Sequence, residues 1–347
     1  MKITMAHGSG GKATSELIAE VFEKTFRDPV LSRMEDSAVL PGPEGRPDAG
    51  RREHRPDSGR IAFTTDSFVV TPLFFPGGDI GRLCVCGTVN DLLMSGAEPR
   101  YLTCAFILEE GAEIGDLRKI AASMAKTARE AGVRIVAGDT KVVEGGGSGS
   151  GEVYINTSGV GFVPDGVDVG PANCEEGDAV LLSGTLGDHH AAILSRRMGI
   201  ENSIVSDCAP LTEMVGALRN AGVRVHAMRD VTRGGLGTVL NEFASSSGCR
   251  IELTEESIPV SEQVRAFCGL LGLDPLYMGN EGKMIAVVPA EDAEKALSCL
   301  RGSRYGQNAA AVGRVVSGDG SAVLLKTPVG GLRVVGPLYG EGLPRIC

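Results

Sequence analysis

The sequence predicts an α/β protein of two domains followed by a short tail. The chain has 347 residues, more than one hydrophobic core usually supports. In both halves, β-like segments alternate with amphipathic helical segments, as layered α/β domains require. Turn-forming residues accumulate at 164–177, just before the apolar segment 179–184. We therefore expect domains over 1–164 and 165–335 and a tail over 336–347.

The N-terminal half contains one segment without apolar periodicity. Residues 41–60 are rich in Pro, Gly, Arg and Asp, which predicts a mobile surface insertion. Residues 60–70, "RIAFTTDSFVV", are β-like and would leave an open sheet edge unless another strand covers it. Residues 114–132, "IGDLRKIAASMAKTAREAG", have the spacing of an amphipathic helix.

Two further β-like segments flank a Gly/Ser-rich stretch. Residues 134–143 and 153–163 are β-like, and 144–152 contains "EGGGSGSGE". A flexible connection between two such segments predicts a hairpin. In the second half, residues 229–244 have the pattern of a polar turn, a glycine pair and a helix, and residues 293–302 that of an amphipathic helix.

Composition excludes several classes of function. A net charge of −10 opposes nucleic-acid binding, because no basic surplus replaces the counterions around phosphates. The N-terminus lacks the apolar core of a signal peptide, and no stretch is long enough for a membrane helix. Nine cysteines scattered along the chain give no disulfide framework, and Cys84 and Cys86 lack a second pair at zinc-site spacing. We expect a cytoplasmic protein that contacts neither nucleic acid nor membrane.

Four aspartates share one local pattern, an acidic residue beside small residues at a predicted strand end. They are Asp36, Asp66, Asp91 and Asp139. Each alone is typical of a turn or a helix cap. Together they suit a hard cation with oxygen ligands, which would bridge to the phosphates of a nucleotide.

The stretch "HGSGGK" at 7–12 lacks the spacing of a Walker loop. Its glycines, Gly10 and Gly11 among them, permit close backbone approach to phosphate, and Lys12 adds a positive charge. A plain N-terminal loop is an equally open interpretation.

Three further features carry reactive side chains. His189 and His190 are adjacent, which predicts capping or solvent-facing roles rather than a shared ligand. Glu281 lies with Lys283 in a polar turn before an apolar segment, a common place for catalytic groups and for ordinary turns. Cys347 ends the chain, after "GPLYGEGLPRI", whose glycines and prolines exclude a helix or a long strand. Such a tail predicts a tether that brings the thiol to a site elsewhere.

Taken together, these motifs resemble those of the HypE family of hydrogenase-maturation proteins. That family belongs to the superfamily of ATP-dependent enzymes that includes aminoimidazole ribonucleotide synthetase and selenophosphate synthetase. The resemblance covers nearly the whole chain, through "AHGSGGK", "GTVNDLLMSGA", "GDTKVV", "SGTLGDH", "DVTRGGLG", "NEGK" and the terminal "PRIC". The aspartate and "DVTRGG" motifs are common to the superfamily, whereas a terminal "PRIC" is much more specific. The 41–60 insertion and His190, where the family commonly has Gly, depart from the pattern.

The resemblance implies a PurM-like fold, a homodimer that pairs N-terminal strands, and an ATP site with Mg²⁺. It implies that a HypF-type carbamoyltransferase loads a carbamoyl group onto Cys347. ATP-dependent dehydration would convert that group to a thiocyanate. The cyano group would then pass to an iron centre on a HypC–HypD complex and become a cyanide ligand of [NiFe] hydrogenase.

The same resemblance suggests roles for particular residues. The four aspartates would bind nucleotide and Mg²⁺, with Asn90 as a supporting ligand. Lys141 would stabilise charge, Glu281 would abstract protons, and Arg345 would help to keep the Cys347 thiol ionised. Two other functions stay open. One is a selenophosphate-type reaction, which would require a reactive Cys or selenocysteine that "MAHGSGGK" lacks. The other is a non-catalytic carrier with a modifiable tail cysteine.

Overall fold

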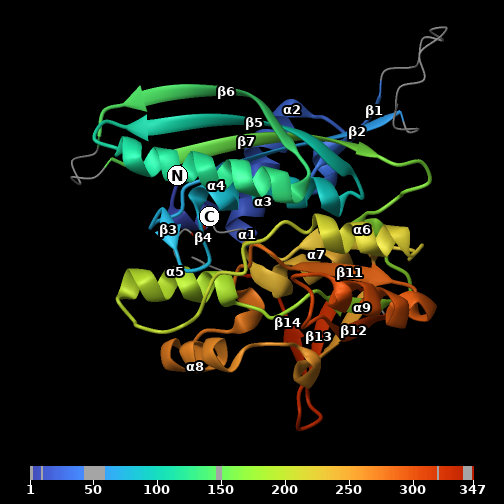
Figure 1. Ribbon diagram of the computed structural model, residues 1–347. Helices are drawn as coiled ribbons and strands as arrows, with labels where there is room; N and C mark the ends of the chain where they lie inside the picture. The colour runs from blue at the N-terminus through green and yellow to red at the C-terminus, as the bar shows by residue number, and fades with distance from the viewer. Residues whose placement is uncertain (1–2, 9–10, 43–58, 146–150, 319, 339–345) are drawn as a thin grey trace, which may run out of the picture.

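The protein is described from a computed structural model, which covers residues 3–8, 11–42, 59–145, 151–318, 320–338 and 346–347. It contains two large β-sheets, one from each half of the chain, with helices packed between and around them (Figure 1). This mixed α/β architecture is the predicted class. The predicted domain bounds themselves stay a prediction, although the first sheet ends at Val163 and the second begins at Ala179.

The N-terminal sheet has five strands in the order β1-β2-β7-β5-β6. β5 pairs in parallel with β6 and antiparallel with β7, and the other pairs are antiparallel. The strands are β1 (Ala38–Pro41), β2 (Arg60–Phe68), β5 (Glu98–Glu109), β6 (Arg134–Val143) and β7 (Val153–Val163). A separate two-stranded ribbon joins β3 (Phe74–Phe75) to β4 (Gly78–Asp79).

This sheet corrects two expectations. Segments 134–143 and 153–163 are strands as predicted, but they form no hairpin, because β5 lies between them in the sheet. Turn composition alone cannot reveal a strand inserted from earlier in the chain. The predicted insertion 41–60 is shorter at both ends, because Pro41 and Arg60 pair as the last and first residues of β1 and β2. Residues 43–58 lie outside the described chain.

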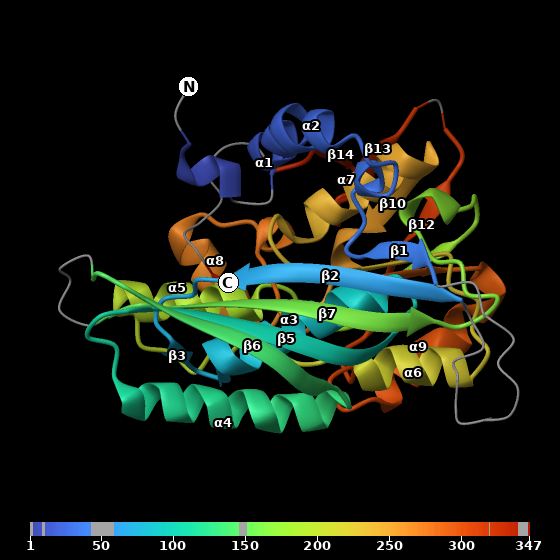
Figure 2. The same ribbon diagram turned by 90° about the horizontal axis from the view of Figure 1, so that it is seen from above.

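Helices cover only one face of this sheet. α3 (Ile80–Met94) and α4 (Ile114–Ala131, as predicted) lie against the inner face. Asp79 caps α3, accepting hydrogen bonds from the N–H groups of Gly81 and Arg82 at 2.8 and 3.1 Å. Seen from above, no helix of the described chain lies over the outer face (Figure 2). Phe63, Tyr101 and Ile107 are exposed there.

The C-terminal sheet has seven strands in the order β14-β13-β10-β12-β8-β11-β9. Its central strands are buried on both faces, since alternate residues of β11 belong to two different hydrophobic clusters. The strands are β8 (Ala179–Leu182), β9 (Ala227–Asp230), β10 (Arg250–Thr254), β11 (Met284–Val288), β12 (Ala310–Val316), β13 (Ala322–Lys326) and β14 (Leu332–Val335).

Helices lie on both sides of this second sheet. α7 (Gly235–Ser247) packs on one face, while α6 (Thr212–Asn220) and α9 (Ala293–Gly302, as predicted) pack on the other. α5 (Asp188–Met198) and α8 (Glu262–Leu271) share a smaller cluster. Two short helices, α1 (Lys12–Leu17) and α2 (Lys24–Phe26), are joined by a π-helical segment, Ile18–Glu23. No helix in the described part of the chain is long and apolar enough to cross a bilayer.

Candidate active site

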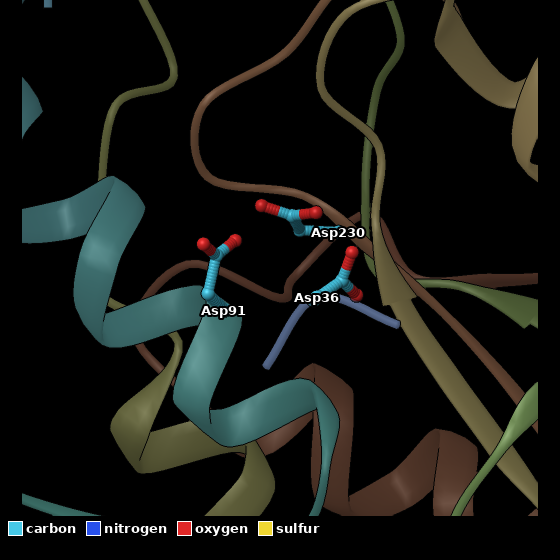
Figure 3. Close-up of side chains that lie close together, drawn as sticks. All are labelled: Asp36, Asp91 and Asp230. Atoms are coloured by element: carbon cyan, nitrogen blue, oxygen red, sulfur yellow. The ribbon is translucent and has the colours of Figure 1, made fainter. Parts of the chain in front are cut away.

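Three carboxylates meet where the two sheets face each other. Asp36 precedes β1, Asp91 lies in α3, and Asp230 ends β9. One carboxylate oxygen from each lies within 4.8 Å of the others. The side chains point toward one another from three separate segments (Figure 3). A cluster of this kind provides the oxygen ligands that Mg²⁺ binds.

Neighbouring side chains orient two of these acids. The Arg229 guanidinium contacts Asp36 Oδ1 at 2.6 Å and Glu242 Oε2 at 3.2 Å. The Thr64 hydroxyl lies 2.8 Å from Asp91 Oδ2. These contacts fix the carboxylates before any ligand arrives.

The cluster holds more negative charge than a buried site favours. Burial, followed by the charges of Asp230, Asp66 and Asp36, raises the pKa of Asp91 well above its ordinary value. Burial also raises the pKa of Asp230 well above its ordinary value, and Asp36 adds to the effect. The pKa of Asp36 is raised by burial although Arg229 opposes the shift. Without a cation the cluster therefore retains protons, and a bound cation would displace them.

Asp66, the third predicted acid near this point, lies beside the cluster. It is on β2, on the face toward α3, and a Cβ added to Gly87 of that helix would lie 3.3 Å from Asp66 Oδ2. Burial raises the pKa of Asp66, and Arg233 opposes the shift. Arg233 also donates a hydrogen bond to Gly8 O at 3.1 Å.

The last two residues of the chain lie in the same region. Ile346 is buried and its carbonyl oxygen lies 2.7 Å from His189 Nε2. Burial raises the pKa of the Cys347 thiol to about 12, with Arg233 opposing and Glu281 adding to the shift. In the docked position burial therefore favours the neutral thiol, while Arg233 favours the ionised one. Arg345 lies outside the described residues.

Glu281, the predicted proton acceptor, is buried next to this terminus. Burial, followed by the charges of Cys208, Asp230 and Asp66, raises its pKa well above the ordinary value. Lys283 is also buried and its Nζ lies 3.3 Å from Asp207 Oδ2. A carboxyl group with a raised pKa therefore lies close enough to the terminal thiol to act on it electrostatically.

The structure does not bring Asp139 and Lys141 to this cluster. They pair with each other, Lys141 Nζ to Asp139 Oδ2 at 2.7 Å, and both side chains are exposed on β6. Asp139 pairs with Ala105 of β5. Ala105 follows buried Cys104, and successive residues of a strand point to opposite faces, so Ala105 and Asp139 are on the outer face of the sheet. The predicted strand end was wrong, because Asp139 lies in the middle of β6, and the local sequence does not determine which face of the sheet it occupies.

The Asn90 side chain contacts backbone groups of the second half of the chain. Its amide group donates to Ala209 O at 3.1 Å, and its carbonyl oxygen accepts from the Leu211 N–H at 2.9 Å. It therefore joins α3 to the second half of the chain. A supporting role of Asn90 toward nucleotide or Mg²⁺ stays a prediction.

The glycine-rich stretch is only partly described. Gly10 lies outside the described residues, and Gly11 is the N-cap of α1. A Cβ at Gly11 would lie 2.6 Å from Leu338 O, so the backbone approach that glycine permits is toward the chain itself. The Lys12 Nζ lies 3.6 Å from Glu16 at the surface. A phosphate contact by this stretch stays a prediction.

Four site residues were not predicted from the sequence. Arg229, Asp230 and Arg233 belong to residues 229–244, whose pattern predicts only a polar turn, a glycine pair and a helix. His189 was expected to cap a helix or to face solvent, and this was wrong because it is completely buried. Its position after the family motif "SGTLGD" was the available signal.

Two family models match the chain. They are the AIR synthase related protein N-terminal domain, over residues 34–163, and the corresponding C-terminal domain, over residues 175–326. The carbamoyl dehydratase HypE of Azotobacter vinelandii is 49% identical, with 99% of this chain and 97% of the relative covered. The chain belongs to the HypE family.

Solved structures of HypE proteins have the same fold. HypE in a HypE–HypF complex is 45% identical, with a TM-score of 0.84 over 93% of this chain and 99% of that one. A HypE solved in complex with ATP is 43% identical, with a TM-score of 0.79 over 100% of both chains. The PurM-like architecture expected from the sequence is thereby confirmed.

Proposed function

We propose that this protein catalyses the ATP-dependent dehydration of an S-carbamoyl group on Cys347 to a thiocyanate. The product would supply the cyanide ligand of the iron in [NiFe] hydrogenase. The supporting observation is that Cys347 docks beside Glu281 and Arg233, next to the three-aspartate cluster, in a chain of the carbamoyl dehydratase family.

The reaction balances with ATP as the acceptor of the carbamoyl oxygen. Phosphoryl transfer to that oxygen converts it to a leaving group, and the C–O bond then breaks as phosphate departs. The nitrogen loses both protons as the C≡N bond forms, leaving thiocyanate, ADP and phosphate. Glu281 is the assigned proton acceptor because it lies next to Cys347, and once ionised its raised pKa would make it a stronger base. The positive charge of Arg233 balances the negative charge at the terminus.

ATP and Mg²⁺ are the cofactors that this site fits. Asp36, Asp91 and Asp230 would hold the cation, because one buried and two half-buried carboxylates with raised pKa values need a positive charge to ionise together. When bound, Mg²⁺ neutralises charge on the transferred phosphoryl group. ATP binding in a HypE that is 43% identical supports the same assignment here.

Three partners complete the proposal. A HypF-type carbamoyltransferase would load Cys347, and the solved HypE–HypF complex of a relative supports this step. A HypC–HypD complex would accept the cyano group. The third partner is a second copy of this chain, because the outer face of the N-terminal sheet exposes Phe63, Tyr101 and Ile107. We place the reaction in the cytoplasm, since all nine cysteines are free thiols, as a reducing compartment keeps them.

The test uses the full-length protein with HypF, carbamoyl phosphate, ATP and Mg²⁺, and follows the mass of the C-terminal peptide. We expect a carbamoyl adduct that becomes a cyano adduct on Cys347. Cys347→Ala should abolish both, while the matched Cys299→Ala variant, changed at a half-buried cysteine of α9, should retain them. An adduct on an internal cysteine of Cys347→Ala, or a carbamoyl adduct that never loses water, would favour the carrier function.

A further inference from the structure

The imidazole of His189 makes a directional contact with the chain terminus. Its Nε2 lies 2.7 Å from Ile346 O, and its Nδ1 lies 2.7 Å from Ser206 Oγ. A carbonyl oxygen can only accept, so Nε2 carries the hydrogen and Nδ1 accepts from the Ser206 hydroxyl. Ser206 Oγ in turn accepts from the Cys208 N–H at 3.0 Å. The tautomer is thus set, and its single N–H donor points at the terminal backbone.

The Ile346 side chain occupies a socket that exists because residue 279 is glycine. A Cβ at Gly279 would lie 2.4 Å from Ile346 Cδ1, closer than carbon atoms approach. Ile346 is only 4% exposed. The Phe75 ring packs edge-on against His189, with ring centroids 5.4 Å apart, and closes the same region. A larger side chain at 279 would displace the terminus.

These contacts divide the recognition of the terminus between backbone and side chain. The hydrogen bond from His189 to the carbonyl oxygen of residue 346 fixes the position of the backbone and does not depend on the side chain at that residue. The socket buries the aliphatic side chain of the penultimate residue, Ile346. The next residue, Cys347, is then adjacent to Arg233 and Glu281, which both act electrostatically on it.

We propose that His189 and the Gly279 socket are positioning elements that fix the register of the last two residues, so that the terminal thiol meets Glu281. This inference rests on the proposed function for its purpose, but the docking itself does not require ATP or a carbamoyl group. His189 is a positioning residue, because it contacts the backbone of Ile346 and not the reacting sulfur.

The experiment measures the alkylation rate of Cys347 by iodoacetamide in the full-length protein without nucleotide, read by mass on the C-terminal peptide. We expect His189→Ala and Gly279→Ala to accelerate alkylation about tenfold, the effect of one lost hydrogen bond or of a blocked socket. His189→Gln retains an N–H donor and should stay near the wild-type rate. Gly216→Ala, on α6 where an added Cβ meets nothing within 4 Å, is the matched control.

The alkylation rates of Cys249 and Cys299 report whether the variants are folded, since both are half-buried elsewhere. With those rates constant, equal Cys347 rates in wild type, His189→Ala and Gly279→Ala would overturn the positioning role. Thiocyanate formation separates the two proposals. Wild-type thiocyanate yield from variants with a released terminus would refute positioning alone. If Cys347 of the wild type is alkylated slowly and both variants speed its alkylation, but the carbamoylated wild-type chain is never dehydrated, only the proposed function is refuted.

Discussion

Replacing Asp91 by Asn tests the cation site with little change in shape. The three carboxylate oxygens lie within 4.8 Å of one another, and two unit charges at that separation interact by about 3.5 kcal/mol at an effective dielectric of about 20. A cation among them gains at least a comparable attraction from each carboxylate. Removing one negative charge should therefore weaken Mg²⁺ binding by at least about 300-fold, since about 1.4 kcal/mol is a factor of ten.

The fold should survive this substitution. The asparagine carbonyl oxygen can still accept from Thr64, and a buried acid with a raised pKa is removed. We expect the melting temperature without Mg²⁺ to be unchanged or higher. The assay is a Mg²⁺ titration that records both the melting temperature and carbamoyl-dependent ATP turnover. Asp116→Asn, at an exposed residue of α4 paired with Lys119, is the control. An unchanged magnesium requirement in Asp91→Asn would refute the cluster as the cation site.

Three other outcomes are expected. Glu281→Gln should bind ATP normally but leave the carbamoyl adduct unconverted, as the C-terminal peptide mass will show; conversion at the wild-type rate would remove it as the base. Val136→Lys, on the exposed strand β6, should yield monomers by light scattering at micromolar concentration, whereas a wild-type monomer would contradict the dimer. Because the pKa values of Asp91 and Asp230 are raised, the native state holds protons that unfolding releases. Stability without Mg²⁺ should therefore fall as pH rises above the ordinary carboxyl range, and Mg²⁺ should raise the melting temperature more at about pH 8 than at about pH 6; an equal increase would contradict proton displacement.

Local chemistry predicted the elements well, and long-range pairing less well. The helix over 114–132 and the strands over 134–143 and 153–163 follow from periodicity within each segment. Their order in the sheet depends on β5, which comes earlier in the chain, and turn composition does not encode it.

The candidate site has the same limit. Asp36 and Asp91 could be proposed as cation ligands because acidic motifs are local, but the predicted strand end was wrong for Asp91, which lies inside helix α3. The outer-face position of Asp139 depends on its pairing with Ala105, and the burial of His189 depends on the chain terminus more than 150 residues away, as its separation of 157 from Ile346 indicates. These relations arise only when distant segments pack together.

Helix α3 is buried along nearly its whole length, with apolar residues on every side. One side packs against the N-terminal sheet and α4, and another contacts β9 and α6 of the second half. The largest hydrophobic cluster accordingly runs through both halves, from Leu83 to Met284 and Leu300. The two domains that the family models match therefore share one hydrophobic core. A cut between them would expose one side of α3 to water, so neither half is a self-sufficient folding unit.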